Sequence, residues 1–426
     1  MGRDHLMPIA ATSVSRWEAQ KKYTAISHGV LVPADEAANG LTQVTRTRAY
    51  HLSNPSSVAT HFSALACSGL TLWVDEQPTC FVTNSDNAIR ALVKVRERGV
   101  GGNGASGEVG ASGEIVRRVP FGKKTGSGHE IPADNRLVLR RRSADAAPLP
   151  THAPDAQLPG MYVLRPMAAC AGVIDALSHG RVHVEPWRVP YTAELSQDFV
   201  RSVQVMDAVR RFLVPQMRKD MACAEAKGLM NGKLFAQVWE ASSAEADSPQ
   251  ETIMRLMVQS IMNAMARNGV SVSEGGGGKG GAGGGANAGG KSGAGGKSGA
   301  GGKGDARAVK VVAPRFEVIP QVELLKHGRR ITALDLLVVE VGSRLWAHLQ
   351  TSKSVELVGN AQMWARSRHV GLQYDGAHHL DRSQRDFDTA VGVVCDEFGV
   401  KVQRVTVGLL REDELKVVIV RKLGGF

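Results

Sequence analysis

The sequence predicts an α+β protein of several domains, because helix-like and strand-like patterns alternate along it and a stretch of simple composition divides it. The chain has 426 residues, of which 43% are hydrophobic, which is enough for two or three domains of ordinary size. Residues 275–304 contain 18 glycines and four lysines but no acidic or large apolar side chain. Such a stretch cannot bury enough apolar surface to offset the entropy lost on ordering, so we expect flexible glycine-rich linkers between folded parts.

Composition and hydrophobic periodicity together predict five consecutive parts. The first is a small α/β domain, the second a basic connector that contains glycine and proline, and the third a mostly helical α+β domain. A disordered linker rich in glycine and lysine then leads to a C-terminal domain with the element order βαβαββ, which we expect to form a two-layer sandwich. The expected boundaries are 1–98, 99–160, 161–270, 271–309 and 310–426.

Apolar spacing predicts the elements of the first two parts. A short helix, two strands and a second helix are expected at 57–66, 70–74, 80–83 and 87–98. In the connector, the alternating patterns at 114–121 and 136–142 predict a hairpin with arginine on its outer face.

Residues 1–28 carry four basic and two acidic side chains without an apolar core region. This composition is typical of an organellar transit peptide, or equally of a disordered cytosolic start.

The third part contains the helix start with the clearest signals in the chain. A strand, a helix, a second strand and a longer helix are expected at 161–165, 168–177, 182–187 and 193–214. Ser248 is then the expected N-cap, with Pro249 at the first helical position and Glu251 placed for a capping box. The apolar stripe of this helix, at 249–267, predicts a packed core, although its methionines also suit an adaptable groove for a protein partner.

The C-terminal part has the most regular pattern. A strand is expected at 316–325, an apolar strand-to-helix stretch at 332–349, and a helix at 354–366. A strand and a helix follow at 370–374 and 382–398, and two closing strands at 400–407 and 415–420 would surround an acidic turn at 411–414. The closing strands make this an α/β sandwich with an open sheet face, a kind of fold that can bind RNA without a pocket.

Positive charge is concentrated in one segment. The net charge is +11, and residues 90–142 hold 12 basic and five acidic side chains, a net +7. Clustered arginine and lysine match the phosphate spacing of a nucleic acid, although a basic loop without a partner is the simpler alternative. The residues expected to contact RNA are Arg117, Arg118, Lys123, Lys124, Arg136, Arg140, Arg141, Arg142, Arg404, Arg421 and Lys422.

Several other sequence patterns resemble cofactor or metal sites but do not predict one. Residues 285–292 match the phosphate-binding loop of nucleotide hydrolases, but neither the strand nor the helix that this loop requires flanks them. The five cysteines are scattered without a Cys-x-x-Cys pair, which disfavours disulfides and structural zinc. Asp335 and Glu340 lie in an apolar stretch as in some nucleases, without a following lysine, and His378-His379 with Asp381 are typical of a solvated turn. We expect no cofactor, no metal and no membrane span.

Two blocks resemble a known family. The first runs Ser63-Ala-Leu-Ala-Cys-Ser-Gly-Leu-Thr-Leu-Trp-Val and continues at Pro78-Thr-Cys-Phe-Val. The second begins His369-Val-Gly-Leu-Gln-Tyr-Asp-Gly-Ala, continues at Gly399-Val-Lys-Val-Gln-Arg-Val and ends Leu415-Lys-Val-Val-Ile-Val-Arg-Lys-Leu. Within 57–98 and 369–423 the chain thus resembles translation initiation factor 3, in a divergent, organellar form. The resemblance implies a non-enzymatic protein that binds the small ribosomal subunit through its rRNA, with a basic connector between two domains.

The sequence therefore predicts an RNA-binding protein without catalytic activity, acting on the small ribosomal subunit or its assembly intermediates. A mitochondrial location is expected, with the cytoplasm as the alternative. Two further functions stay open at this point: a structural subunit of a mitochondrial ribonucleoprotein or RNA-processing complex, and a metal-dependent nuclease. The helix at 249–267 is the expected contact for any protein partner.

Overall fold

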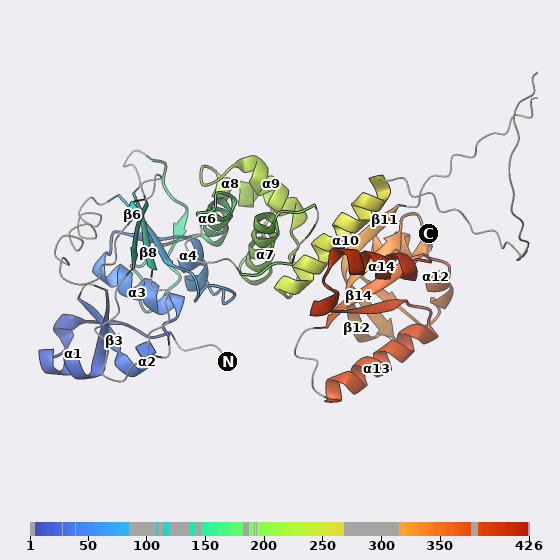
Figure 1. Ribbon diagram of the computed structural model, residues 1–426, viewed down its shortest axis with the longest axis horizontal. Helices are drawn as coiled ribbons and strands as arrows, with labels where there is room; N and C mark the ends of the chain where they lie inside the picture. Colours follow the sequence, from blue (N-terminus) through green and yellow to red (C-terminus); the bar gives the residue numbers. More distant parts are fainter. Residues whose placement is uncertain are drawn as a thin grey trace, which may run out of the picture. The chain divides into compact units, whose positions relative to one another are not determined.

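The computed structural model describes residues 5–27, 29–38, 40–84, 108–109, 114–118, 136–141, 146–181, 187–190, 192, 194–267, 315–375 and 382–424 (Figure 1). It contains two compact units, one formed mainly by residues up to Met257 and the other mainly by residues from Val258 onward. The expected linker at 271–309, the expected helix at 87–98 and all but the last residue of the expected strand at 182–187 lie outside the described residues.

A small antiparallel sheet forms the start of the first unit. Its strands are β1 (Ile9–Ala10), β2 (Tyr23–Ser27) and β3 (Val30–Pro33), in the order β1-β3-β2. Helix α1 (Arg16–Lys22) is capped by Ser15, whose Oγ accepts a hydrogen bond from the Glu18 amide at 3.1 Å. Helix α2 (Ala34–Ala38) follows β3. Residues 16–27 form α1 and β2, against the alternative of a disordered start, and Ile26 of β2 shares a buried apolar cluster with Val30 and Val32 of β3.

A seven-stranded sheet joins parts of the chain that composition separates at residues 98 and 160. Its order is β6-β7-β8-β5-β4-β10-β9. Strand β5 pairs in parallel with β8, and β4 pairs in parallel with β10, so partners come from distant segments. The strands are β4 (Val58–Ala59), β5 (Thr79–Thr83), β6 (Glu108–Val109), β7 (Glu114–Arg118), β8 (Arg136–Arg141), β9 (Thr151–His152) and β10 (Val163–Leu164). The composition of one segment cannot predict that it pairs with a strand so far away in the sequence.

Helix α3 (Gln43–Ser53) is buried over nine consecutive residues, although it contains two arginines and a histidine in that stretch. Its Tyr50 ring lies 4.4 Å from the Phe81 ring of β5. Arg48 is accommodated by Asp155, to which its Nε and Nη2 donate at 2.6 and 3.1 Å. Although burial opposes it, hydrogen bonds from Arg48 and the Gln157 amide hold the pKa of Asp155 below its ordinary value. The buried charge of Arg48 is thus compensated by an opposite charge.

The rest of the first unit is helical (Figure 1). Its helices are α4 (His61–Cys67), α6 (Pro166–Ser178), α7 (Gln197–Phe212), α8 (Lys219–Ala226), α9 (Gly232–Ala241) and the start of α10 (Pro249–Arg267). The N-cap predicted at the start of α10 is confirmed, because Ser248 Oγ accepts from the Glu251 amide at 3.2 Å. Glu251 reaches back one residue further than in a capping box, since its Oε2 accepts from the Asp247 amide at 3.1 Å. The strand expected at 70–74 is a loop, and its Leu72 and Trp73 line a pocket together with residues of α7 and α10.

The C-terminal sheet has the strand order β13-β11-β12-β14-β15. The long strands β11 and β12 form an antiparallel hairpin, and β12 also pairs antiparallel with β14. The strands are β11 (Phe316–Lys326), β12 (Arg329–Glu340), β13 (Ser354–Glu356), β14 (His369–Asp375) and β15 (Val402–Thr406). Four helices accompany them: α11 (Arg344–Leu349), α12 (Ala361–Ala365), α13 (Arg382–Glu397) and α14 (Glu412–Lys422). Apolar residues of α11, α12 and α13 share one core with the sheet.

The α+β, multi-domain fold class is confirmed, but the element order of the C-terminal part differs from the expected βαβαββ. The segment at 415–420 is helical, within α14, instead of forming a closing strand. Leu415 and Ile419 are buried one helical turn apart, while Val417 between them is 57% exposed. The acidic residues that follow Arg411 begin this helix, where they complement its dipole. The expected helix at 354–366 is likewise the short strand β13 followed by α12.

Replacing Gly371 with alanine should destabilise the C-terminal sheet by about 1–3 kcal/mol. A Cβ atom on Gly371 would lie 2.7 Å from Cδ1 and 2.9 Å from Cδ2 of Leu334, whose side chain is completely buried. Chemical denaturation, followed by hydrogen exchange in β12 and β14, measures the change. The matched control is Gly392→Ala in α13, where a Cβ meets nothing within 4 Å and stability should rise slightly. Equal effects of the two substitutions would contradict the packing described here.

Candidate nucleic-acid interface and aromatic pocket

The basic hairpin predicted from the sequence is present in the backbone of the first unit. Strands β7 and β8 pair antiparallel with Arg118 opposite Arg136, Arg117 opposite Leu137 and Glu114 opposite Arg140. Five of the predicted RNA-contacting residues, Arg117, Arg118, Arg136, Arg140 and Arg141, lie on these two strands, whereas Lys123, Lys124 and Arg142 lie outside the described residues.

The three predicted contacts near the C-terminus lie on other elements. Arg404 is on β15, and Arg421 and Lys422 are in the last turn of α14. Lys422 Nζ donates to the Val402 carbonyl at 3.4 Å, and its own carbonyl accepts from Lys401 Nζ at 3.0 Å. Cations in the last turn of a helix complement its dipole. Lys422 thus has a structural role in joining α14 to β15, and Arg421 is exposed beside it.

The apolar stripe of α10 belongs to the core of the protein. Ile253, Leu256, Met257, Ile261 and Met265 are each at most 9% exposed. This bears out the interpretation of the stripe as packed core. A partner protein would therefore have to contact other residues of this helix.

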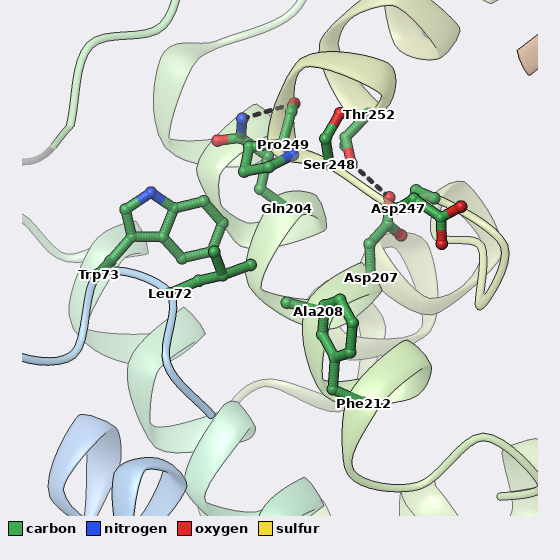
Figure 2. A pocket seen from close by; sticks show the side chains of 11 residues that line it. Leu72, Trp73, Gln204, Asp207, Ala208, Phe212, Asp247, Ser248, Pro249 and Thr252 are labelled. Atoms are coloured by element: carbon green, nitrogen blue, oxygen red, sulfur yellow. Dashed lines mark hydrogen bonds between the residues drawn. The ribbon is translucent and has the colours of Figure 1, made fainter. Parts of the chain in front are cut away.

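A small, shallow pocket lies among the 70–74 loop, α7 and the start of α10. Figure 2 shows Trp73 and Leu72 from the loop and Phe212 from α7 around it. Trp73 has a φ of 60°, a left-handed conformation that costs a bulky residue free energy. Its ring stacks on Trp187 with 4.4 Å between the ring centroids and 9° between the planes. One wall of the pocket is therefore the Trp73 indole, whose backbone is strained and whose ring stacks on Trp187.

The polar groups around this pocket are bonded to one another. Trp187 Nε1 donates to Gln204 Oε1 at 2.6 Å, and Gln204 Nε2 donates to the Pro249 carbonyl at 2.9 Å. Asp207 accepts from Thr252 Oγ1 at 2.7 Å, one of the dashed lines of Figure 2. With both side-chain amide atoms of Gln204 and the Asp207 carboxylate engaged, the pocket presents mainly apolar and aromatic surface to a ligand.

Asp207 is the centre of a buried ion pair at the base of the pocket. Its Oδ2 lies 2.6 Å from Arg255 Nη2, with the two side chains 3% and 5% exposed. Its Oδ1 accepts from the Ser243 amide at 2.6 Å. Burial raises the pKa of Asp207 above its ordinary value, and the Arg255 guanidinium with the hydrogen-bond donors acts against that rise. All of these contacts link α7 to α10 and to the turn before it, which identifies the pair as structural.

The described residues contain no cluster suited to metal catalysis. No group of three or more His, Cys, Asp or Glu side chains within that part of the chain could hold a metal ion. Asp335 and Glu340 are five residues apart on β12, so their side chains point to opposite faces. The His378-His379 pair and Asp381 lie outside the described residues.

Cys67 and Cys170 are poor nucleophiles. Burial raises the pKa of Cys67 to about 12 and raises that of Cys170 as well. A thiol reacts as its thiolate, which is scarce at neutral pH when the pKa is this high.

Comparison of the chain with protein-family models, with curated proteins and with solved structures found no match. Among the described helices, none is long and apolar enough to cross a bilayer. Any inference about function therefore depends on the geometry of the chain itself.

Sequence reasoning missed the aromatic pocket. Leu72 and Trp73 were expected in one strand and Trp187 at the end of another. Nothing in the sequence therefore predicts that the Trp73 ring stacks on Trp187. The one available signal was a large aromatic residue beside the turn sequence Asp75-Glu76-Gln77-Pro78. Large aromatic side chains on loops are over-represented at binding surfaces.

Proposed function

We propose that this chain is a non-enzymatic RNA-binding protein that contacts phosphate groups through the β7–β8 hairpin. The observation that supports this most is the register that places Arg118 opposite Arg136 at one end of the hairpin, with Arg117 beside Arg118 in sequence and the Arg140-Arg141 pair at the other end of β8. Five arginines on two adjacent strands within a segment of net charge +7 suit a polyanion. The target within this proposal is the small ribosomal subunit or its assembly intermediates, in mitochondria, which only the resemblance to translation initiation factor 3 supports.

RNA binding by the full chain should weaken steeply with salt, because bound phosphates release counterions. For single strands, each neutralised phosphate contributes about 0.7 to the slope of log K against log salt. The triple variant Arg117→Gln, Arg118→Gln, Arg136→Gln should therefore reduce the magnitude of that slope by about 2. Fluorescence anisotropy with a labelled single-stranded RNA, between about 50 and 200 mM salt, measures it.

The control variant removes the same charge elsewhere in the first unit. Arg16, Lys227 and Lys233 are exposed, so replacing these three by glutamine should leave the slope within about 0.5 of the unmodified chain. Equal slopes for the two triple variants would mean that the hairpin is not the phosphate contact. Crosslinking in cells, followed by sequencing of the bound RNA, tests the ribosomal target separately.

A further inference from the structure

We propose that one end of the C-terminal sheet is a second phosphate-binding surface for RNA. This surface consists of Arg315, Arg344, Arg366, Arg368 and Lys401, and is called the basic end of the sheet below. The inference rests on the proposed function, because it takes RNA as the ligand. It adds a contact in the C-terminal unit to the one proposed for the β7–β8 hairpin of the first unit.

Backbone hydrogen bonds bring two of these arginines to the end of β12. The Val341 amide donates to the Arg315 carbonyl at 2.8 Å, and the Glu340 amide donates to the Arg368 carbonyl at 3.0 Å. Arg315, at the start of β11, and Arg368, at the start of β14, therefore flank the end of β12 on its two sides. Two strand spacings separate their backbones, which is about 10 Å.

The other three cations join this end from separate segments. The Gly371 amide of β14 donates to the Lys401 carbonyl at 2.8 Å, and the Lys401 amide donates to His369 Nε2 at 3.1 Å. Arg344 begins α11 directly after the turn that ends β12, and Arg366 is the C-cap of α12 just before β14. The cluster is thus assembled by the fold from positions spread over more than eighty residues, and no basic run in the sequence indicates it.

The fold does not neutralise these charges. Four of the five side chains are exposed and Arg368 is half-buried. Within the part of the chain that the structure describes, none of the five forms an ion pair with a carboxylate. Arg344 also occupies the first position of α11, where the helix dipole disfavours a cation. A bound anion would therefore balance charge that the C-terminal unit leaves unbalanced.

The cations near the other end of β11 differ in this respect. Arg330 Nη1 lies 3.1 Å from Glu323 Oε1, and Lys326 Nζ lies 3.6 Å from Glu397 Oε2. There the protein supplies the opposite charge itself, so an external anion gains less from binding.

Carboxylates near the basic end are fewer than its cations. Glu317 and Glu340 lie on the same strand ends, and Asp396 lies five residues before Lys401. Glu317 is already engaged, because its Oε2 accepts from Trp346 Nε1 at 2.6 Å. Five basic against three acidic side chains leave an excess of positive charge, which attracts a polyanion.

The composition of the basic end suits phosphate. Four of its five residues are arginines, whose planar guanidinium can donate two parallel hydrogen bonds to a phosphate group. Stable protein interfaces usually have an apolar or aromatic centre. Among the described residues of these strand ends, Val341 is the exposed large apolar side chain, at 38%. RNA is therefore a better fit than a protein partner, and a second contact on one chain strengthens binding because it becomes intramolecular once the first is made.

The test measures the salt dependence of RNA binding by the full chain, with the same labelled single-stranded RNA and anisotropy readout as for the hairpin. The basic-end variant is Arg315→Gln, Arg344→Gln, Arg366→Gln. It should reduce the magnitude of the slope of log K against log salt by about 2, and by about 4 when combined with the hairpin triple variant. Because the three arginines are exposed, the variant should melt at the temperature of the unmodified chain.

The matched control removes the same charge near the other end of β11. Arg329, Arg330 and Lys353 are exposed, and replacing these three by glutamine should leave the slope within about 0.5 of the unmodified chain. Competition by polyglutamate, at the same concentration of charge as unlabelled RNA, distinguishes an acidic peptide from RNA as the occupant. Unlabelled RNA should be the stronger competitor for the chain that carries the hairpin triple variant.

The outcomes separate the two proposals. If the chain binds no RNA, both fail. If the basic-end variant keeps the slope of its control while the hairpin variant loses slope, the basic end is overturned and the hairpin contact stands. If only the basic-end variant loses slope, the basic end is the phosphate contact and the hairpin proposal is overturned. If polyglutamate competes as well as RNA for the chain with the hairpin variant, the basic end binds acidic peptides and the inference is overturned.

Discussion

Replacing Asp207 with alanine is expected to lower the free energy of unfolding of the helical part of the first unit by about 3–5 kcal/mol. The substitution leaves the Arg255 guanidinium, 5% exposed, without its carboxylate partner. It also removes the acceptor for Thr252 Oγ1 and the Ser243 amide. An uncompensated buried charge costs far more than the pair itself contributes. Urea denaturation of the full chain, followed by hydrogen exchange in α7 and α10, measures the loss.

Two further variants show whether the buried charge is the cause. Asp207→Ala combined with Arg255→Met removes both charges, and we expect it to recover a large part of the lost stability. Asp220 pairs with Arg218 at 2.8 Å on the surface, with side chains 68% and 73% exposed. Asp220→Ala should therefore cost less than about 1 kcal/mol. If the single and double variants were equally unstable, lost packing rather than lost charge pairing would explain the effect.

The folded parts that could be predicted from the sequence are those with local signals. The start of α10 was visible because Ser248, Pro249 and Glu251 each have a separate physical preference for their position, and they agree. The apolar stretch at 332–349 was expected to change from strand to helix, and it does so between Glu340 and Arg344, where Ser343 caps α11. In both places the determinants lie within a few residues of one another.

The misplaced elements are those in which distant contacts override local preference. The β-branched residues of 415–420 favour a strand in isolation, but burial of Leu415 and Ile419 on one side selects a helix. Arg46 and Arg48 gave α3 a polar composition, and the charge of the buried Arg48 is compensated by Asp155, 107 residues later in the chain. A partner that far along the chain cannot be inferred from spacing.

The same distinction applies to the candidate site. The excess of basic residues at 90–142 is a property of composition and was found from the sequence, together with the hairpin that places five of the arginines on neighbouring strands. The aromatic pocket requires residues from a loop, from α7 and from the start of α10. The basic excess can therefore be seen in the local sequence, whereas the pocket arises only on folding.

Acidification from pH 7 to pH 4 is expected to remove about 3 kcal/mol of stability from the C-terminal sheet through His369 alone. Burial lowers the pKa of His369 to about 4, from an ordinary value of 6.5. Its Nδ1 donates to the Ser367 carbonyl at 2.9 Å, and its Nε2 accepts from the Lys401 amide at 3.1 Å, so both nitrogens are committed in the neutral ring. Protonation would place a proton on Nε2 facing that amide.

The pH window follows from the two pKa values. Between about pH 6.5 and pH 4 the unfolded chain carries a proton on this histidine and the folded chain does not, so acid favours unfolding throughout that interval. Below about pH 4 both states are protonated and His369 contributes no further loss. Above pH 6.5 both are neutral, and the contribution of this residue to stability is constant.

Exchange of His369 for glutamine should flatten this dependence, because an amide can donate to Ser367 and accept from Lys401 without titrating. Hydrogen exchange of the Gly371 amide, which donates to the Lys401 carbonyl at 2.8 Å, reports local opening of the sheet in the full chain. Carboxylates titrate in the same range, so the informative quantity is the difference between the two proteins at each pH. The exposed His179 supplies the control, and His179→Gln should leave the profile unchanged. Parallel profiles for His369→Gln and the unmodified chain would show that this imidazole already accepts a proton in the folded sheet.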